Sequence, residues 1–212
     1  MKAVIFDLDG VLVFTDAFHY QAWKQMADRL GIYFDEKINN RLRGVSRMDS
    51  LEIILENYKG APFSYAEKCA LADEKNEAYK KLLQKMTAAD VSEEVRRTLR
   101  ELRDRGYKLA IGSSSKNTRF ILAQTKLEDV FDAVSDGTNI SRSKPDPEVF
   151  LKAASFLGEQ PRDCLVVEDA EAGIDAAKSG GMKAAGIGAA AKYERTDYRI
   201  QKISDLLFLE FG

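Results

Sequence analysis

A short apolar run that ends in two carboxylates lies almost at the start of the chain and limits the folds open to it. Residues 4–6 have the composition of a buried parallel strand, and Asp7 and Asp9 follow before Gly10 permits a turn. Side chains two residues apart in extended backbone point to the same side. Two carboxylates at the end of a buried strand are costly unless a cation or hydrogen bonds compensate them. The stretch predicts either a nucleophile and an acid/base beside Mg²⁺ at the carboxyl edge of a sheet, or a strand that ends in a solvated acidic turn.

Length, charge and cysteine content exclude several classes of protein. The 212 residues suffice for one domain or for a domain with a sizeable insertion, and the net charge of −2 gives no footprint for nucleic acid. Cys69 and Cys164 are far apart, as reduced packing residues of a cytoplasmic protein would be. The acids of the N-terminal run argue against a signal peptide, and no apolar stretch is long enough to span a bilayer. We expect a cytoplasmic protein that binds neither nucleic acid nor membrane.

The segment between residues 15 and 87 is helical in pattern throughout. Apolar residues recur at helical spacing from Phe18 to Leu30, and Gly31 supplies a stop. Further helices are predicted for three stretches separated by turn-forming sequences, around residues 35–42, 47–58 and 64–86. No strand is predicted in this segment. We therefore expect an all-helical domain at 15–87, inserted into a second domain made of residues 1–14 and 88–212.

From residue 90 onward, helix and strand patterns alternate. A helix capped by Ser92 is predicted to end at Arg105, and Asp146 with Pro147 predicts the N-cap and first turn of a helix to Leu157. The other predicted elements are strands at 107–112, 131–135, 164–167 and 182–187, and helices at 117–124 and ending at Gly180. This alternation predicts an α/β fold, a Rossmann-like parallel sheet with helices on both faces.

Polar side chains with useful chemistry occur at three later points, two of them strand ends. Ser113 follows a predicted strand and could bond a phosphate oxygen, or could be a turn serine. Lys144 precedes a proline in an extended loop and could serve a site or be solvated. Glu168 and Asp169 end another strand, where they could hold a cation or cap the next helix.

The order of these motifs is Asp-x-Asp, then Ser, then Lys-Pro, then Glu-Asp. This order resembles the haloacid dehalogenase-like phosphotransferase superfamily over essentially the whole chain. The helical segment is similar to the cap domain that the superfamily inserts after its first strand. The resemblance implies that Asp7 is the nucleophile that becomes an aspartyl phosphate and that Asp9 is the acid/base.

The resemblance also implies a metal site and a phosphate site. The metal is expected to be Mg²⁺, held by Asp7, Asp169 and the backbone carbonyl of Asp9, with Glu168 nearby. Phosphoryl transfer needs positioning and charge neutralisation, which a metal and a lysine supply. The residues implied to bind the transferring phosphoryl group are Ser113, Ser114 and Lys144.

Four further stretches, at residues 14–19, 43–50, 74–77 and 113–117, narrow the resemblance to the β-phosphoglucomutase branch of the superfamily. Members of this branch exchange β-glucose 1-phosphate and glucose 6-phosphate through β-glucose 1,6-bisphosphate, so the implied partners are small sugar phosphates. The branch usually has alanine at the position of Ser114 and often has an acid at that of Phe14. Neither departure removes a catalytic group, but together they leave the exact sugar open.

The sequence Ser46-Arg47-x-Asp49 has the spacing of a capping box. Either these residues only start a helix and Arg47 points to water, or the helix start is an anion site at which Arg47 grips the second phosphate of the substrate. The resemblance favours the anion site. It further implies substrate contacts from six other residues, which are Trp23, Gly44, Ser50, Ser115, Lys116 and Asn117.

His19 is the only histidine in the chain. A lone histidine on a helix is usually packed or solvated, and no second histidine is available for a metal pair. The resemblance implies that His19 works with Lys75 to couple sugar binding to closure of the cap. It places Thr15 at the hinge.

We predict a monomeric, Mg²⁺-dependent phosphomutase. The nearest rival is a phosphatase of small sugar phosphates on the same scaffold, which would share the acids and Lys144. Arg47, His19 and Lys75 are the residues that favour the mutase. A non-enzymatic regulator that binds sugar phosphates through a decayed site is the rival from another class, and the intact acids argue against it.

Overall fold

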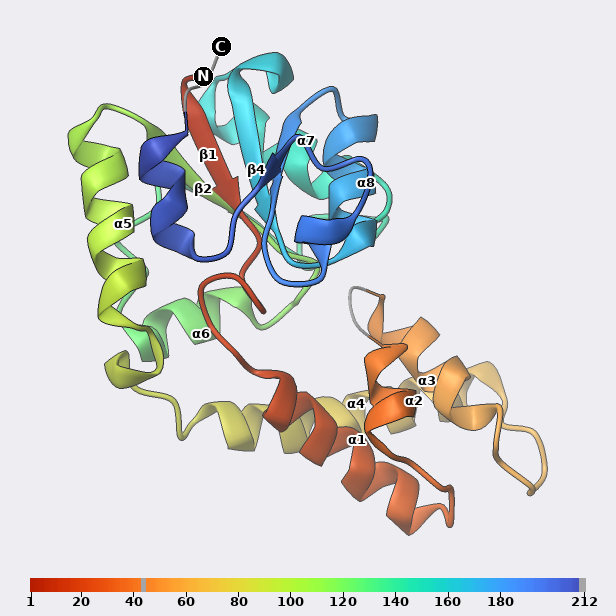
Figure 1. Ribbon diagram of the computed structural model, residues 1–212. Coiled ribbons are helices and arrows are strands. Elements are labelled where there is room, and N and C mark those ends of the chain that lie inside the picture. Colours follow the sequence, from red (N-terminus) through yellow and green to blue (C-terminus); the bar gives the residue numbers. More distant parts are fainter. Residues whose placement is uncertain (43–44, 210–212) are drawn as a thin grey trace. The chain divides into compact units, whose positions relative to one another are not determined.

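The structure is a computed structural model that describes residues 1–42 and 45–209 (Figure 1). The chain forms two compact units, each with its own core. One unit comprises Met1–Phe14 and Met86–Gly212, and the other comprises Thr15–Lys85. We call the first the core unit and the second the helical unit.

A six-stranded parallel sheet forms the centre of the core unit. The strand order is β3-β2-β1-β4-β5-β6, so the first strand of the chain lies inside the sheet between β2 and β4. Ile5 is in register with Ala110 on one side and with Val166 on the other. The strands are β1 (Ala3–Phe6), β2 (Lys108–Gly112), β3 (Ala133–Ser135), β4 (Cys164–Glu168), β5 (Lys183–Gly186) and β6 (Tyr198–Arg199). The predicted α/β fold with a parallel sheet is confirmed.

Helices cover both faces of this sheet (Figure 1). The helices of the core unit are α5 (Glu93–Asp104), α6 (Thr118–Thr125), α7 (Glu148–Leu157) and α8 (Glu171–Ser179). Short 3₁₀ turns lie at Ala88–Asp90, Pro161–Asp163, Ala190–Lys192 and Ile203–Phe208. Ala3 and Ile5 pack with Phe150 of α7 and Ile174 of α8 in one buried cluster. The alternate side chains of β1 are equally buried, as strands covered on both faces require.

One local prediction for the core unit needs correction, and two short elements were not predicted. Pro147 is the N-cap of α7 and not a first-turn residue, because the helix begins at Glu148. Asp146 still supports this helix start, since its Oδ1 accepts a hydrogen bond from the Glu148 N–H at 3.0 Å. The edge strand Tyr198–Arg199 and the 3₁₀ turn after it were not predicted, because a two-residue strand carries no periodic pattern. The Ser92 cap is confirmed, its side chain accepting from the Val95 N–H.

The helical unit contains four α-helices, and its described residues include no strand. The helices are α1 (Asp16–Arg29), α2 (Glu36–Asn40), α3 (Arg47–Leu55) and α4 (Tyr65–Leu83). Trp23 and Met26 of α1 pack with Leu71 and Ala72 of α4 in a common apolar cluster. Ser64 starts α4 with a capping box, because its Oγ accepts from the Glu67 N–H while the Glu67 carboxylate accepts from the Ser64 N–H. Among the described residues, we find no helix with the length and apolar content needed to cross a bilayer.

Candidate active site

An acid cluster lies at the carboxyl edge of the sheet in the core unit. Asp7 follows β1, Glu168 is the last residue of β4, and Asp169 comes next. The two strands are paired in parallel, and the Asp7 N–H donates to the carbonyl of Val167 at 2.9 Å. One carboxylate oxygen from each acid lies within 4.8 Å of the others. Carboxylate oxygens at this spacing are the donor set that a hard divalent cation prefers.

Lys144 joins two of these acids from the loop before α7. Its Nζ donates to Asp7 Oδ1 at 2.6 Å and to Glu168 Oε1 at 2.5 Å, and only 3% of its side chain is exposed. Burial would lower the pKa of Lys144, but the charges and hydrogen bonds of Asp7 and Glu168 outweigh burial and raise it. Lys144 therefore stays an ammonium, a fixed positive charge beside the Asp7 carboxylate.

The turn after β1 contains Asp9 and passes close to Asp169 at the same edge. Gly10 has a φ of +83° and donates its N–H to the carbonyl of Val13 at 2.8 Å. A Cβ at position 10 would lie 2.2 Å from Asp169 Oδ2, so glycine is needed here for both the backbone and the close approach. Asp9 is half-buried in this turn and forms a bridge with Val13.

The loop after β2 contains the predicted phosphate-binding residues. Ser113 Oγ accepts from the Ser115 N–H at 3.2 Å, and Ser115 Oγ accepts from the Asn117 N–H at 3.2 Å. The Ser114 Oγ is buried without a hydrogen-bond partner among the described residues, whereas Lys116 is exposed. Because β2 is next to β1, the loop lies at the edge that carries Asp7. Asn117 is the N-cap of α6, so the loop leads directly into the N-terminus of a helix.

A second polar cluster lies inside the helical unit. Lys75 of α4 is buried, and its Nζ lies 2.9 Å from His19 Nδ1. The same Nζ lies 4.5 Å from the Trp23 ring centroid and 4.7 Å from that of Tyr79. His19 stacks on Tyr79, whose hydroxyl donates to Thr15 Oγ1 at 3.1 Å. Thr15, predicted as the hinge, is thus bound to α4 through Tyr79.

The protonation of His19 follows from these contacts. Burial and then the charges of Lys75 and Arg47 lower the pKa of His19 well below its ordinary value. The imidazole is therefore neutral. An ammonium can only donate, so Nδ1 accepts the hydrogen bond from Lys75 and the ring proton is on Nε2.

Stability is expected to depend on pH through His19. Because the pKa is lowered in the folded state, the unfolded chain takes up the proton first as the pH falls below about 6.5. The contribution of the neutral ring is complete above that pH and is lost below it. Between about pH 7.5 and about pH 5.5, the native chain should lose about 1 kcal/mol more of its unfolding free energy than His19→Gln does. Denaturant unfolding at both pH values measures this difference, and equal losses in the two proteins would contradict it.

Arg47 is held by α4 and is only partly exposed. Its Nη2 donates to Asn76 Oδ1 at 2.8 Å, and its Nη1 lies 3.5 Å from Asp73 Oδ1. Ser46 starts α3 as predicted, with its Oγ accepting from the Asp49 N–H at 3.2 Å. The guanidinium is thus paired within the helical unit, and its role toward a substrate stays a prediction.

Of the other substrate residues predicted in the helical unit, two are described by the structure and one is not. Ser50 is buried on α3 and Trp23 is buried on α1. Gly44 lies outside the described residues.

No role was assigned to Asn76 from the sequence, although the helical spacing of α4 could have pointed to it. Together with Lys75, Asn76 lies on the buried face of α4, which also carries Leu71, Ala72, Tyr79 and Leu83.

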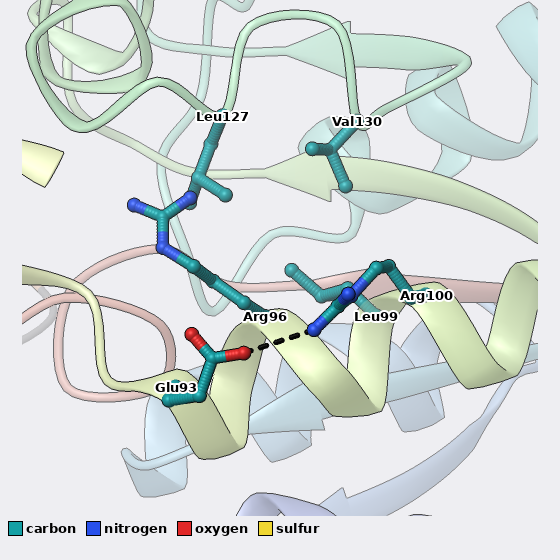
Figure 2. A pocket seen from close by; sticks show the side chains of 6 residues that line it. All are labelled: Glu93, Arg96, Leu99, Arg100, Leu127 and Val130. Atoms are coloured by element: carbon teal, nitrogen blue, oxygen red, sulfur yellow. Dashed lines mark hydrogen bonds and ion pairs between the residues drawn. The ribbon is translucent and has the colours of Figure 1, made fainter.

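A hollow away from the acid cluster lies beside α5 in the core unit, with a volume of about 290 Å³ (Figure 2). Leu99, Leu127 and Val130 are its apolar lining residues. At its rim, Arg100 Nη2 donates to Glu93 Oε1 at 2.9 Å (Figure 2). No predicted site residue lines this hollow.

The fold and the acid–lysine cluster define an α/β protein of the class that transfers phosphoryl groups. The sequence profile of the haloacid dehalogenase-like hydrolases matches residues 1–181. The chain belongs to this family. It is 44% identical over 208 residues to the β-phosphoglucomutase of Bacillus subtilis (strain 168), an alignment that covers 97% of this chain and 92% of the relative. The predicted resemblance to the superfamily and to its β-phosphoglucomutase branch is confirmed.

Other relatives include both a mutase and a phosphatase. The crystal structure of β-phosphoglucomutase from Clostridium difficile superposes with a TM-score of 0.90 at 37% identity, covering 97% of this chain and 93% of that one. The phosphorylated carbohydrates phosphatase of Thermotoga maritima is 30% identical over 86% of this chain and 83% of its own length. Both activities therefore occur among proteins similar to this chain.

Proposed function

We propose that the chain interconverts β-glucose 1-phosphate and glucose 6-phosphate through β-glucose 1,6-bisphosphate. One observation carries phosphoryl transfer, namely the contact of Lys144 with Asp7 within the acid cluster, and the 44% identity to a β-phosphoglucomutase favours the mutase. This contact places a fixed positive charge beside the carboxylate that is proposed as the nucleophile. Proteins of the family that are similar in sequence to this chain include β-phosphoglucomutases.

The reaction begins with Asp7 carrying a phosphoryl group. The 6-hydroxyl of β-glucose 1-phosphate attacks that phosphorus, Asp9 takes the hydroxyl proton, and the Asp7 carboxylate leaves. The bisphosphate then presents its other end. Asp7 attacks the 1-phosphoryl group, and Asp9 returns the proton to the departing sugar oxygen. Glucose 6-phosphate leaves and the phosphorylated Asp7 is restored, so no water and no net phosphate is consumed.

Lys144 is proposed to stabilise both phosphoryl-transfer steps electrostatically. Its ammonium lies 2.6 Å from Asp7 Oδ1 and is proposed to neutralise charge on the phosphoryl group that Asp7 carries. Glu168 holds the ammonium from the other side at 2.5 Å. Ser113 and Ser114 are proposed to bind the same phosphoryl oxygens from the loop after β2.

We propose Mg²⁺ as the metal of the acid cluster. Asp7, Asp169 and the backbone carbonyl of Asp9 are the proposed ligands, and their oxygens are the hard donors that Mg²⁺ selects. Glu168 is better suited to holding Lys144, because both of its oxygens already accept hydrogen bonds, from Lys144 and from the Ala170 N–H. When bound, the metal supplies charge neutralisation and orientation for the phosphoryl group.

The helical unit is proposed to act as a cap domain that binds the phosphate not undergoing transfer. Arg47 is the proposed ligand of that phosphate, with Ser115, Lys116 and Asn117 meeting it from the core unit. The geometry that supports this role is the anchoring of Arg47 by Asn76 and Asp73, which fixes one edge of the guanidinium. A positioned guanidinium is a strong binder of phosphate oxygens.

Arg47→Ala is expected to lower mutase turnover by about 2–4 kcal/mol of transition-state free energy, because a charge-assisted phosphate contact is lost. Hydrolysis of acetyl phosphate has no distal phosphate and should change little. Steady-state rates with both substrates measure the difference. Arg29→Ala is the matched control, since Arg29 also pairs across to α4 but is exposed. Equal losses in both reactions would make Arg47 a structural residue.

The phosphatase relatives make hydrolysis of small sugar phosphates the second candidate function. The two candidates differ in the fate of the phosphoryl group. Incubation with β-glucose 1-phosphate, Mg²⁺ and a trace of the bisphosphate should yield glucose 6-phosphate if the chain is a mutase. Release of free phosphate at a comparable or higher rate would favour the phosphatase.

A further inference from the structure

Glu168 lies directly against the backbone of helix α8, at a residue without a side chain. A Cβ added to Gly173 would lie 1.9 Å from Glu168 Oε1, 2.0 Å from its Cδ and 2.5 Å from its Cγ. Any residue other than glycine at this position would therefore occupy the space of the Glu168 carboxylate. Gly173 is the third residue of α8, in its first turn, and glycine is a poorer helix former than alanine.

Glu168 has little freedom to move aside. It is 1% exposed, its Oε1 accepts from Lys144 Nζ at 2.5 Å, and its Oε2 accepts from the Ala170 N–H at 3.0 Å. A displaced carboxylate would leave the Lys144 ammonium with Asp7 as its one remaining carboxylate partner among those described. Closely packed interiors transmit such a shift to the neighbouring groups.

We infer that Gly173 is a positioning residue that acts through Glu168 on Lys144, and so sets where the ammonium lies relative to Asp7. Its role in turnover rests on the proposed phosphoryl transfer, but the coupling between Gly173 and Glu168 does not. This role explains why α8 contains a glycine at a position where helix formation alone would favour alanine.

The test is a double-mutant cycle of Gly173→Ala and Glu168→Ala, read by thermal unfolding. With Glu168 present, Gly173→Ala should lower the melting temperature, because the new methyl group displaces a buried, paired carboxylate. With Glu168→Ala, the same substitution should raise it, because the space is free and alanine favours the helix. A change of the same sign and size in both backgrounds would overturn the inference, whatever reaction the protein catalyses.

Turnover provides the second readout. Gly173→Ala should reduce the rate of Asp7 phosphorylation by acetyl phosphate at least roughly tenfold while leaving the circular dichroism spectrum unchanged. Gly180→Ala is the matched control at the end of the same helix, where the new Cβ would come no closer than 3.3 Å to Pro147 Cβ, and it should keep the native rate. A native rate in Gly173→Ala would also overturn the inference. If native protein is not phosphorylated at all, the proposed function fails while the melting-temperature cycle still decides the coupling.

Discussion

Asp7→Asn is expected to reduce phosphoryl transfer at least roughly ten-thousandfold, because the amide cannot form the aspartyl phosphate. The fold should persist. Asparagine keeps an oxygen that can accept the Lys144 hydrogen bond, and Lys144 retains Glu168 as a charged partner. Mutase and acetyl phosphatase rates should fall together, since both reactions pass through the same nucleophile. Initial rates and a thermal melt of the same preparation give the two readouts.

The matched control for this substitution is Asp129→Asn. Asp129 is an exposed aspartate of the same unit, and its replacement should leave both rates near the native values. Residual activity of Asp7→Asn within tenfold of the native rate would show that another residue is the nucleophile.

Removal of the metal is expected to have the next largest effect. Chelation should stop turnover completely and added Mg²⁺ should restore it. Asp169→Ala should weaken Mg²⁺ affinity roughly hundredfold or more, because one of the few charged ligands of the site is lost. Its effect on sugar-phosphate binding measured without metal should be much smaller. Calorimetric titration of each variant with Mg²⁺ alone separates the two effects.

Asp163→Ala provides the control for the metal titration. This acid belongs to a 3₁₀ turn before β4, where it pairs with the exposed Lys2. It should leave Mg²⁺ affinity unchanged. Full turnover in excess chelator would rule out a metal at the acid cluster.

The carboxyl edge of the sheet could be predicted because polar residues with useful chemistry follow three of its strands, β1, β2 and β4. Apolar runs identify β1 and β4, and parallel pairing brings Asp7 beside Glu168 and Asp169 whatever the lengths of the connections. The order of the motifs, through the family resemblance, predicted that Lys144 also lies at this edge. Its contacts with both acids depend on the path of a loop, for which sequence periodicity carries no signal.

Other features could not be predicted because they depend on packing between helices. The contact of Arg47 with Asn76 joins residues of α3 and α4, and nothing near Arg47 in the sequence indicates it. The fit of the Glu168 carboxylate against Gly173 depends on how α8 packs against the end of β4, for which the sequence carries no signal. Periodicity could place Lys75 and Asn76 on one face of α4, and the resemblance paired Lys75 with His19, but the contact between these two side chains depends on how α1 packs against α4.

The central claim is that Asp7 carries the phosphoryl group and returns it to a sugar. Bisphosphate with labelled phosphoryl groups should label the protein once, and peptide mapping should place the label on Asp7. Adding unlabelled β-glucose 1-phosphate should then move the label into the bisphosphate and glucose 6-phosphate. Label on any other residue, or its release as free phosphate in place of transfer to sugar, would contradict the account.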